Sequence, residues 1–252
     1  MYIKCFILLA NMKIIQSFFL FLLFSIVYGC SNGTDVSSLC FEKEYYEKPL
    51  LENPSEIMFS GGSNNLSVEV SDDNVLEATI GAGKIKIKTK KNGIVYLVVK
   101  DKTENTSVTI RVKVVDSYLG LQLGKPIPNN SVYNEDDRLY LVNNKSKSFY
   151  LYDKSFNLKA TGNYKLFVKS SNYFLSLVFS DKVCFYNISN SSYDFLWGAI
   201  PTYLEFLWTN EGFTTTNARD VSPVVMTAFD LDTNNVYYFN VDSTEFPYGI
   251  LN

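Results

Sequence analysis

The sequence contains no histidine, and this absence excludes whole classes of site. The chain cannot form Ser–His or Cys–His nucleophilic sites, nor a zinc or copper centre with histidine ligands. A long basic run is lacking too, since 23 Lys+Arg against 26 Asp+Glu give a net charge of -3. Binding to nucleic acid depends on clustered Lys and Arg, so nucleic acid is not a predicted partner.

Cysteine is scarce as well, with four in the chain. Cys5 and Cys30 lie near the N-terminus, which leaves Cys40 and Cys184 for the body of the protein. These two form one disulfide in an oxidising compartment, or they remain two inert thiols. Their surroundings favour two thiols, because Cys40 lies in a polar stretch and Cys184 in an apolar one. Their spacing is not that of a metal site, and no cofactor is predicted.

The first 29 residues have the character of an export signal. They contain no acidic residue, and their only charges are Lys4 and Lys13. Met12 is an alternative start that would place Lys13 just before the apolar run of residues 14–27. This run has the length of a secretory signal and is short for a membrane span. An uncleaved signal anchor is the alternative interpretation.

The end of this run, Val27-Tyr28-Gly29-Cys30, resembles the lipobox of bacterial lipoproteins. In that family the cysteine becomes the mature N-terminus and carries the acyl chains. The resemblance implies a signal peptide over residues 1–29, lipidation of Cys30 and attachment to the cell envelope, with the outer membrane as the expected membrane. The polar residues 30–49 that follow are predicted to be a flexible tether.

Residues 50–116 alternate between apolar and polar side chains. Leu66, Val68 and Val70 alternate with polar residues, and Ile85 and Ile87 alternate with lysines. This period of two, with turns about 10 residues apart, is typical of a β-sandwich. Stretches 71–76, 83–85, 91–99 and 108–115 resemble the group 2 bacterial immunoglobulin-like domain. The resemblance implies an immunoglobulin-like sandwich that serves as a spacer or adhesive module, without a catalytic site.

Residues 117–130 contain Gly120, Gly124, Pro126 and Pro128 and are predicted to be a linker. The C-terminal domain, residues 131–252, resembles no family. Its apolar stretches predict strands and no helix, so the fold class is all-β, with a second antiparallel β-sandwich or barrel. The predicted strands are residues 138–142, 149–152, 164–169, 173–179, 183–188, 204–208, 212–216, 224–230 and 236–241.

One motif in this domain has the oxygen ligands of a calcium loop. Asp230, Asp232 and Asn234 stand at alternate positions, which suits a hard cation. However, Asn235 and Val241 occupy the positions where an EF-hand loop requires Gly and Glu. A hairpin turn explains the same residues and is the favoured interpretation.

Aromatic residues are dense between positions 193 and 213. Trp197, Tyr203, Trp208 and Phe213 form a candidate binding surface, because exposed rings stack on sugars and on partner side chains. Packing in the core of the β domain, where aromatic residues are common, explains the same residues and is the favoured interpretation.

Together these patterns favour a non-catalytic lipoprotein of the cell envelope that recognises a glycan or a protein at the surface. A structural accessory subunit of an envelope protein complex is the alternative. A hydrolase with paired carboxylates is a third hypothesis, which needs two facing acids in a cleft that the sequence does not show.

Overall fold

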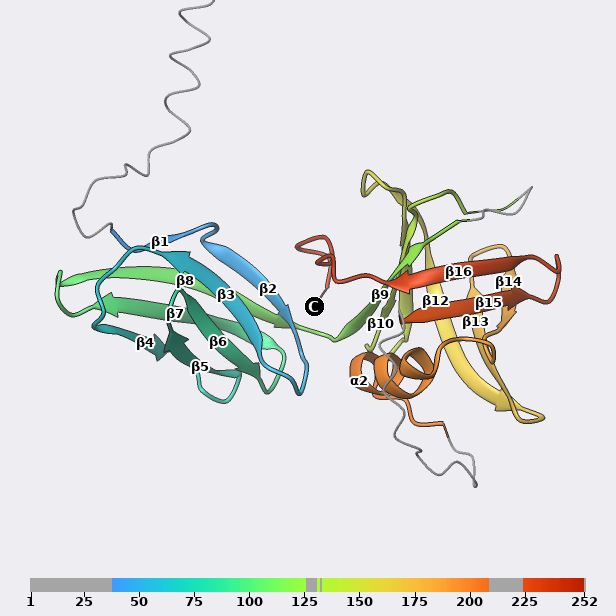
Figure 1. Cartoon of the computed structure of the whole chain (residues 1–252), viewed down its shortest axis with the longest axis horizontal. Helices are drawn as coiled ribbons and strands as arrows, with labels where there is room; N and C mark the ends of the chain where they lie inside the picture. Colours follow the sequence, from blue (N-terminus) through green and yellow to red (C-terminus); the bar gives the residue numbers. More distant parts are fainter. Residues whose placement is uncertain (1–37, 126–130, 132, 209–223, 252) are drawn as a thin grey trace, which may run out of the picture.

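The computed structural model describes residues 38–125, 131, 133–208 and 224–251 of the chain. These residues form two β domains joined end to end, a sandwich followed by a closed barrel (Figure 1). The all-β fold class predicted from the sequence is confirmed.

The N-terminal domain is a sandwich of two four-stranded sheets with the orders β1-β3-β6-β5 and β2-β8-β7-β4. If β1 is strand A and β3 to β8 are strands B to G, the sheets read A-B-E-D and C-F-G, which is the immunoglobulin order. Strand β2 is added beside β8, to which it runs parallel. The strands are β1 (Cys40–Phe41), β2 (Tyr45–Pro49), β3 (Ser55–Ser60), β4 (Leu66–Val70), β5 (Leu76–Gly81), β6 (Lys84–Thr89), β7 (Gly93–Asp101) and β8 (Thr106–Val115).

Alternation along each strand builds the core of the sandwich. In β6, Ile85 and Ile87 are fully buried, whereas Lys86 and Lys88 between and beside them are exposed. In β7, Val95, Leu97 and Val99 fill the space between the sheets. Successive side chains of a strand point to opposite faces, so the local pattern fixes which face of each sheet is buried.

The predicted tether is wrong over its second half, because β1 and β2 lie within residues 40–49. The sequence there looks polar, but Tyr46, Glu47 and Lys48 are all buried. Five consecutive pairs with β8, from Tyr45 with Arg111 to Pro49 with Val115, hold β2 in the sheet. Residues 30–37 lie outside the described part of the chain.

The C-terminal domain is a closed antiparallel barrel with the order β10-β11-β12-β13-β14-β15-β16-β9. A barrel of about eight strands has an interior that side chains can fill. Here Phe149, Tyr133, Tyr186 and Tyr237 are among the rings that fill it, and a residual void beside Tyr133 has no room for a water molecule. The strands are β9 (Tyr118–Leu123), β10 (Arg138–Val142), β11 (Ser148–Tyr152), β12 (Leu158–Lys169), β13 (Asn172–Val178), β14 (Val183–Asn187), β15 (Val225–Asp230) and β16 (Val236–Val241).

The predicted linker is also wrong in part, because its residues 118–123 form β9, which closes the barrel between β10 and β16. Glycine at position 120 here serves close packing rather than linker flexibility. A Cβ at this position would lie 2.7 Å from the carbonyl oxygen of Asp242 and 3.2 Å from the ring of Tyr140. Residues 126–130 lie outside the described residues.

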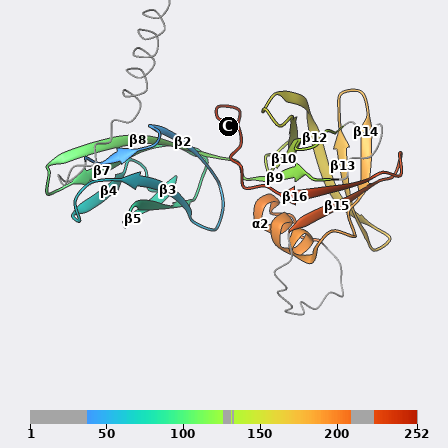
Figure 2. The same cartoon turned by 45° about the horizontal axis from the view of Figure 1, so that its top comes forward.

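The predicted strand 204–208 does not form: residues 205–208 belong to no helix or strand, and a helical segment that was not predicted comes before them. The π-helical turn η1 (Phe195–Ala199) leads into helix α2 (Ile200–Leu204), whose last residue begins the predicted strand 204–208. The segment lies against one end of the barrel (Figure 2) and buries Phe195, Leu196 and Ile200 in the barrel core. It is too short for the sequence to show a helical period of apolar residues. The predicted strand 212–216 lies outside the described residues.

Candidate functional site

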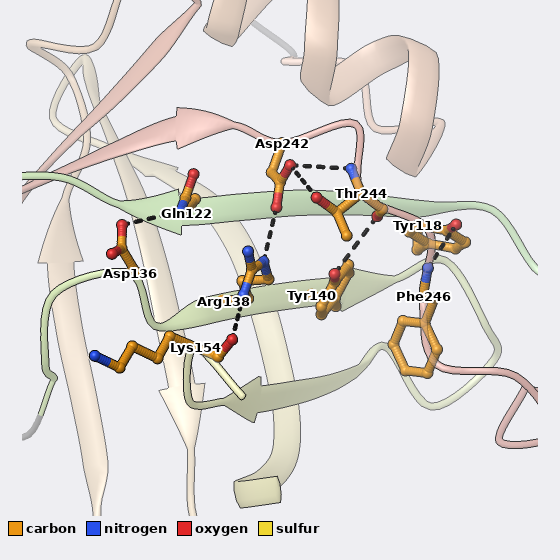
Figure 3. A network of polar contacts seen from close by, with 9 residues as sticks. All are labelled: Tyr118, Gln122, Asp136, Arg138, Tyr140, Lys154, Asp242, Thr244 and Phe246. Atoms are coloured by element: carbon orange, nitrogen blue, oxygen red, sulfur yellow. Dashed lines mark hydrogen bonds and ion pairs between the residues drawn. The ribbon is translucent and has the colours of Figure 1, made fainter. Parts of the chain in front are cut away.

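After β16 the chain leaves the barrel wall and runs between the two domains. We call residues 242–251 the C-terminal segment. Its start is fixed on the barrel by Asp242, whose Oδ2 accepts a hydrogen bond from Arg138 Nε at 3.2 Å (Figure 3). The other oxygen, Oδ1, accepts bonds from the backbone N–H and the hydroxyl of Thr244, at 2.9 and 2.6 Å. These contacts turn the chain away from the barrel.

Phe246 then packs on the outside of the barrel among tyrosine rings. It is 3% exposed, and its ring lies 4.9 Å from Tyr140, 5.2 Å from Tyr150 and 5.5 Å from Tyr118, centroid to centroid. Its backbone N–H donates to the hydroxyl of Tyr118 at 3.0 Å. Burial of a whole phenyl side chain contributes about 1.5–3 kcal/mol, so this residue is the main apolar anchor of the segment.

Ion pairs and hydrogen bonds tie the same segment to the sandwich. Glu245 lies 3.4 Å from the ammonium group of Lys48 and 3.6 Å from that of Lys43. The backbone N–H of Gly249 donates to the buried carboxylate of Glu47 at 2.9 Å. Lys113 donates to the carbonyl oxygen of Leu251 at 2.5 Å. The segment therefore connects the two domains through contacts on both sides.

The protonation states of this region follow from these contacts. Burial raises the pKa of Glu245, but the hydrogen bond from Tyr248 and the charges of Lys48 and Lys43 outweigh burial, so the pKa of Glu245 is lowered overall. Burial, together with the hydrogen bond to Glu47 and its charge, raises the pKa of Tyr45 to about 12. At neutral pH the carboxylate of Glu245 is ionised and the phenol of Tyr45 is a donor.

A groove of about 880 Å³ lies where the segment meets both domains, and we call it the interdomain groove. One wall comes from the sandwich, the other from the barrel, and the C-terminal segment lines the space between them. Apolar surface predominates in it, with charged groups among the rings. The lining residues are Lys43, Glu44, Tyr45, Phe156, Thr244, Glu245, Phe246, Pro247 and Tyr248.

Three rings of the groove each lie close to a cationic side chain. Lys43 Nζ lies 5.0 Å from the ring centre of Tyr248, and the guanidinium groups of Arg138 and Arg111 lie 4.6 and 5.1 Å from those of Phe156 and Tyr45. Tyr45 and Tyr248 also meet edge to face at 5.8 Å. Such contacts contribute about 0.5–1 kcal/mol each at exposed sites. The groove thus offers fixed aromatic surface beside polar groups, an arrangement typical of ligand sites.

Of the aromatic residues predicted as a binding surface, the three that the structure describes do not line this groove. Trp208 is 6% exposed, and its indole N–H donates to the carbonyl oxygen of Leu196 at 2.8 Å, so it belongs to the barrel core. Trp197 is half-buried and packs edge to face on Tyr173 at 6.0 Å. Tyr203 lines a smaller cleft of about 200 Å³ beside the C-terminal segment. Phe213 lies outside the described residues.

For Trp208 the binding interpretation is wrong, because the short segment after β14 folds across the barrel end and buries this ring. The sequence pattern did not indicate the residues that line the groove. Tyr45 was assigned to a polar tether, and Phe156 follows β11 in a turn. A signal was present at Phe246-Pro247-Tyr248, since two aromatic residues after the last strand need a surface to cover them.

The calcium motif forms a hairpin turn between β15 and β16. Asp230 Oδ1 accepts the backbone N–H groups of Asp232 and Thr233 at 2.9 and 3.3 Å, and Asn234 has a φ of 58°. Asp230 is 6% exposed, so its carboxylate serves the turn. Within the described residues, no three His, Cys, Asp or Glu side chains gather as a metal site.

The cysteines and the membrane prediction can be placed only in part. Cys40 is an exposed free thiol and Cys184 a buried one. Cys30, the predicted lipidation site, lies outside the described residues. In the ranges that the structure describes, no helix has the length and apolar character of a membrane span.

Comparison with known proteins leaves the function open. No family model matches the chain, and no curated protein matches it. Among solved structures it is similar to domains 5-6 of the S-layer protein SbsC, with 12% sequence identity and a TM-score of 0.26. The alignment covers 83% of this chain and 86% of that one. A similarity this weak carries no argument about fold or function.

Proposed function

We propose that this protein is a non-catalytic lipoprotein of the cell envelope, anchored through Cys30, that recognises a glycan or a protein at the surface. The interdomain groove is the observation that carries this proposal. It is a wide and open groove of about 880 Å³, in which aromatic rings and charged groups lie together. Its rings and charged groups come from both domains, so the ligand would be held between them.

The chemistry of the groove suits a glycan. The faces of a sugar ring carry C–H groups that pack on aromatic rings such as those of Phe156 and Tyr248. Sugar hydroxyls require donors and acceptors, and the ammonium group of Lys43 and the carboxylates of Glu44 and Glu245 lie in the same groove. Hydrogen bonds to charged groups are the stronger ones, which gives such a site orientation as well as affinity.

The proposal is tested by a glycan-array screen of the mature chain and of two groove variants, Phe156→Ala and Tyr248→Ala. Removal of a ring that contacts ligand costs about 1–3 kcal/mol, so we expect binding to weaken roughly 5- to 150-fold in each variant. Phe167→Ala is the matched control, because this ring lies on the outside of the barrel at the β12–β13 pair. Full binding by a folded double variant that carries both Phe156→Ala and Tyr248→Ala would contradict the proposal. A folded wild type that binds no glycan would restrict it to a protein ligand.

The alternative, a structural accessory subunit of an envelope complex, requires an apolar face that a partner subunit can cover. On the barrel, the apolar side chains of Val178, Val183, Phe185 and Tyr238 are 39–41% exposed, and they are the observation that favours this alternative.

A further inference from the structure

The interdomain groove continues onto the outer face of the sandwich sheet that contains β2, β8, β7 and β4. Tyr45, which lines the groove, pairs with Arg111 of β8, and Arg111 pairs with Tyr96 of β7. The three side chains share the outer face, because the residues that follow them in each strand are buried in the core of the sandwich. We call Tyr45, Arg111 and Tyr96 the cross-strand row.

The row is held on rigid strands and faces water. The guanidinium group of Arg111 lies 5.1 Å from the ring centre of Tyr45, and Tyr96 is 50% exposed. The backbone of Tyr96 is fixed on both sides, since its N–H donates to the hydroxyl of Ser71 at 2.9 Å and its carbonyl oxygen accepts from the N–H of Ser71 at 3.0 Å. Neighbouring strands lie about 4.7–4.9 Å apart, so the row spans about 10 Å from β2 to β7, which is longer than one sugar ring.

Polar contacts border the row along its length. On the side of the barrel, the C-terminal segment covers the sheet, and Lys113 donates to the carbonyl oxygen of Leu251 at 2.5 Å. On the other side, beyond one intervening pair of residues, Lys100 and Glu69 form an ion pair at 2.6 Å. The row is therefore a strip of ring and guanidinium surface that leads out of the groove and across the sheet.

The charges of the groove and the row carry no clear excess of one sign. Glu245 is paired with Lys43 and Lys48. Among the described residues of the groove and the row, Glu44 and Arg111 form no ion pair, which leaves one charge of each sign. Three of the rings also lie beside a cation of the protein itself, and this cation occupies the place that a cationic ligand would take. These surroundings suit an uncharged ligand.

Recognition on this face uses side chains and not backbone. Strand β8 lies between β2 and β7, and β7 lies between β8 and β4, so their N–H and C=O groups are paired within the sheet. A peptide therefore cannot add to β7 or β8 as a further strand, which is a common way for a peptide to bind a sheet. The row offers instead a ring face and guanidinium N–H donors, which pack on the C–H face of a sugar and bind its hydroxyls.

We propose that the cross-strand row extends the site in the interdomain groove, so that the complete site takes an uncharged, linear glycan of several sugar units. Units in the groove would contact Tyr248 and Phe156, and the units that follow would lie along Arg111 and Tyr96. This inference rests on the proposed function and adds the class of glycan to it. A monosaccharide or disaccharide would fill the groove alone and leave the row unused.

The experiment applies the mature chain to an array of mono-, di-, tetra- and hexasaccharides, both uncharged and acidic, and then titrates the hexasaccharide that binds most strongly and its disaccharide. We expect this hexasaccharide to be uncharged and to bind roughly tenfold or more tightly than the disaccharide. Tyr96→Ala should remove this gain and leave disaccharide binding unchanged, whereas Tyr96→Phe, which keeps the ring, should bind as the wild type does. Tyr193→Ala is the matched control, since Tyr193 is also 50% exposed but lies on the barrel domain.

The outcomes separate the cross-strand row from the groove. Hexasaccharide binding that Tyr248→Ala weakens and Tyr96→Ala does not would keep the groove as the glycan site and overturn the row. Equal affinity for the disaccharide and the hexasaccharide, or a preference for acidic glycans, would also overturn it. A folded wild type that binds no glycan would overturn both the row and the glycan part of the proposed function. Thermal unfolding checks each variant, and Tyr96→Thr, which suits a strand, replaces Tyr96→Ala if that variant does not fold.

Discussion

At the scale of single residues, the carboxylate of Asp101 illustrates how one side chain fixes two loops. It accepts the backbone N–H and hydroxyl of Ser63, at 2.5 and 2.6 Å, and the N–H groups of Thr103 and Glu104. The hydrogen bonds from Ser63 are the largest contribution that lowers the pKa of Asp101 to about 2. The loop before β4 and the turn after β7 are thereby joined.

This pKa makes the stability of the sandwich depend on acidity. The folded pKa of about 2 lies below the ordinary value of 3.8, so the stabilisation is present above about pH 4 and is lost as the pH falls towards 2. In Asp101→Asn we expect lower stability at neutral pH and a flatter decline between pH 4 and 2. Urea unfolding followed by circular dichroism at several pH values measures both. An unchanged slope in the variant would show that Asp101 does not contribute to this decline.

At the scale of elements, two glycines differ in the space that a side chain would find at their positions. A Cβ on Gly162 of β12 would lie 2.0 Å from the backbone oxygen of Val178 on β13 and 2.7 Å from the ring of Phe149. A Cβ on Gly198 of η1 would meet no atom within 4 Å. The glycine of β12 therefore permits close pairing of strands, whereas Gly198 occupies open space.

Overpacking usually costs about 1–3 kcal/mol. We predict that Gly162→Ala destabilises the barrel by at least the upper end of this range, because the new methyl group would force the backbone of β12 and β13 apart. Gly198→Ala is the matched control and should be neutral or stabilising by up to about 1 kcal/mol, since alanine is the better helix former. Equilibrium denaturation of the two variants compares them directly. Equal stability of both would contradict the close approach at Gly162.

The elements differ in how far local sequence predicts them. The strands of the sandwich were predictable because apolar and polar residues alternate within each strand, as in β6. Strand β2 was not, since the burial of Glu47 and Lys48 depends on partners supplied by the C-terminal segment. The segment η1–α2 was not predictable either, because ten residues packed on a barrel end show no helical pattern of their own.

At the scale of the whole molecule, the C-terminal segment sets how the two domains meet. In Glu245→Lys, the ion pairs with Lys43 and Lys48 become repulsions, while the packing of Phe246 on the barrel remains. We expect the sandwich and the barrel to be held together less tightly, which small-angle X-ray scattering would show as a larger radius of gyration. The stability of the barrel itself should change little. Glu44→Lys is the matched control, since it makes the same charge change at an exposed position of the same groove. A radius of gyration equal to that of the control would contradict this role of Glu245.

The sequence by itself determined the all-β class, the faces of the sandwich strands and the absence of histidine chemistry, because composition and alternation are local properties. The tertiary structure alone decided the barrel closure, the buried position of Trp208 and the groove. These features join residues far apart in the chain: Arg138 and Asp242 are separated by 104 positions, and Glu47 and Gly249 by 202. No local pattern encodes such pairs, since each partner has the same neighbours in sequence whether or not the other is near.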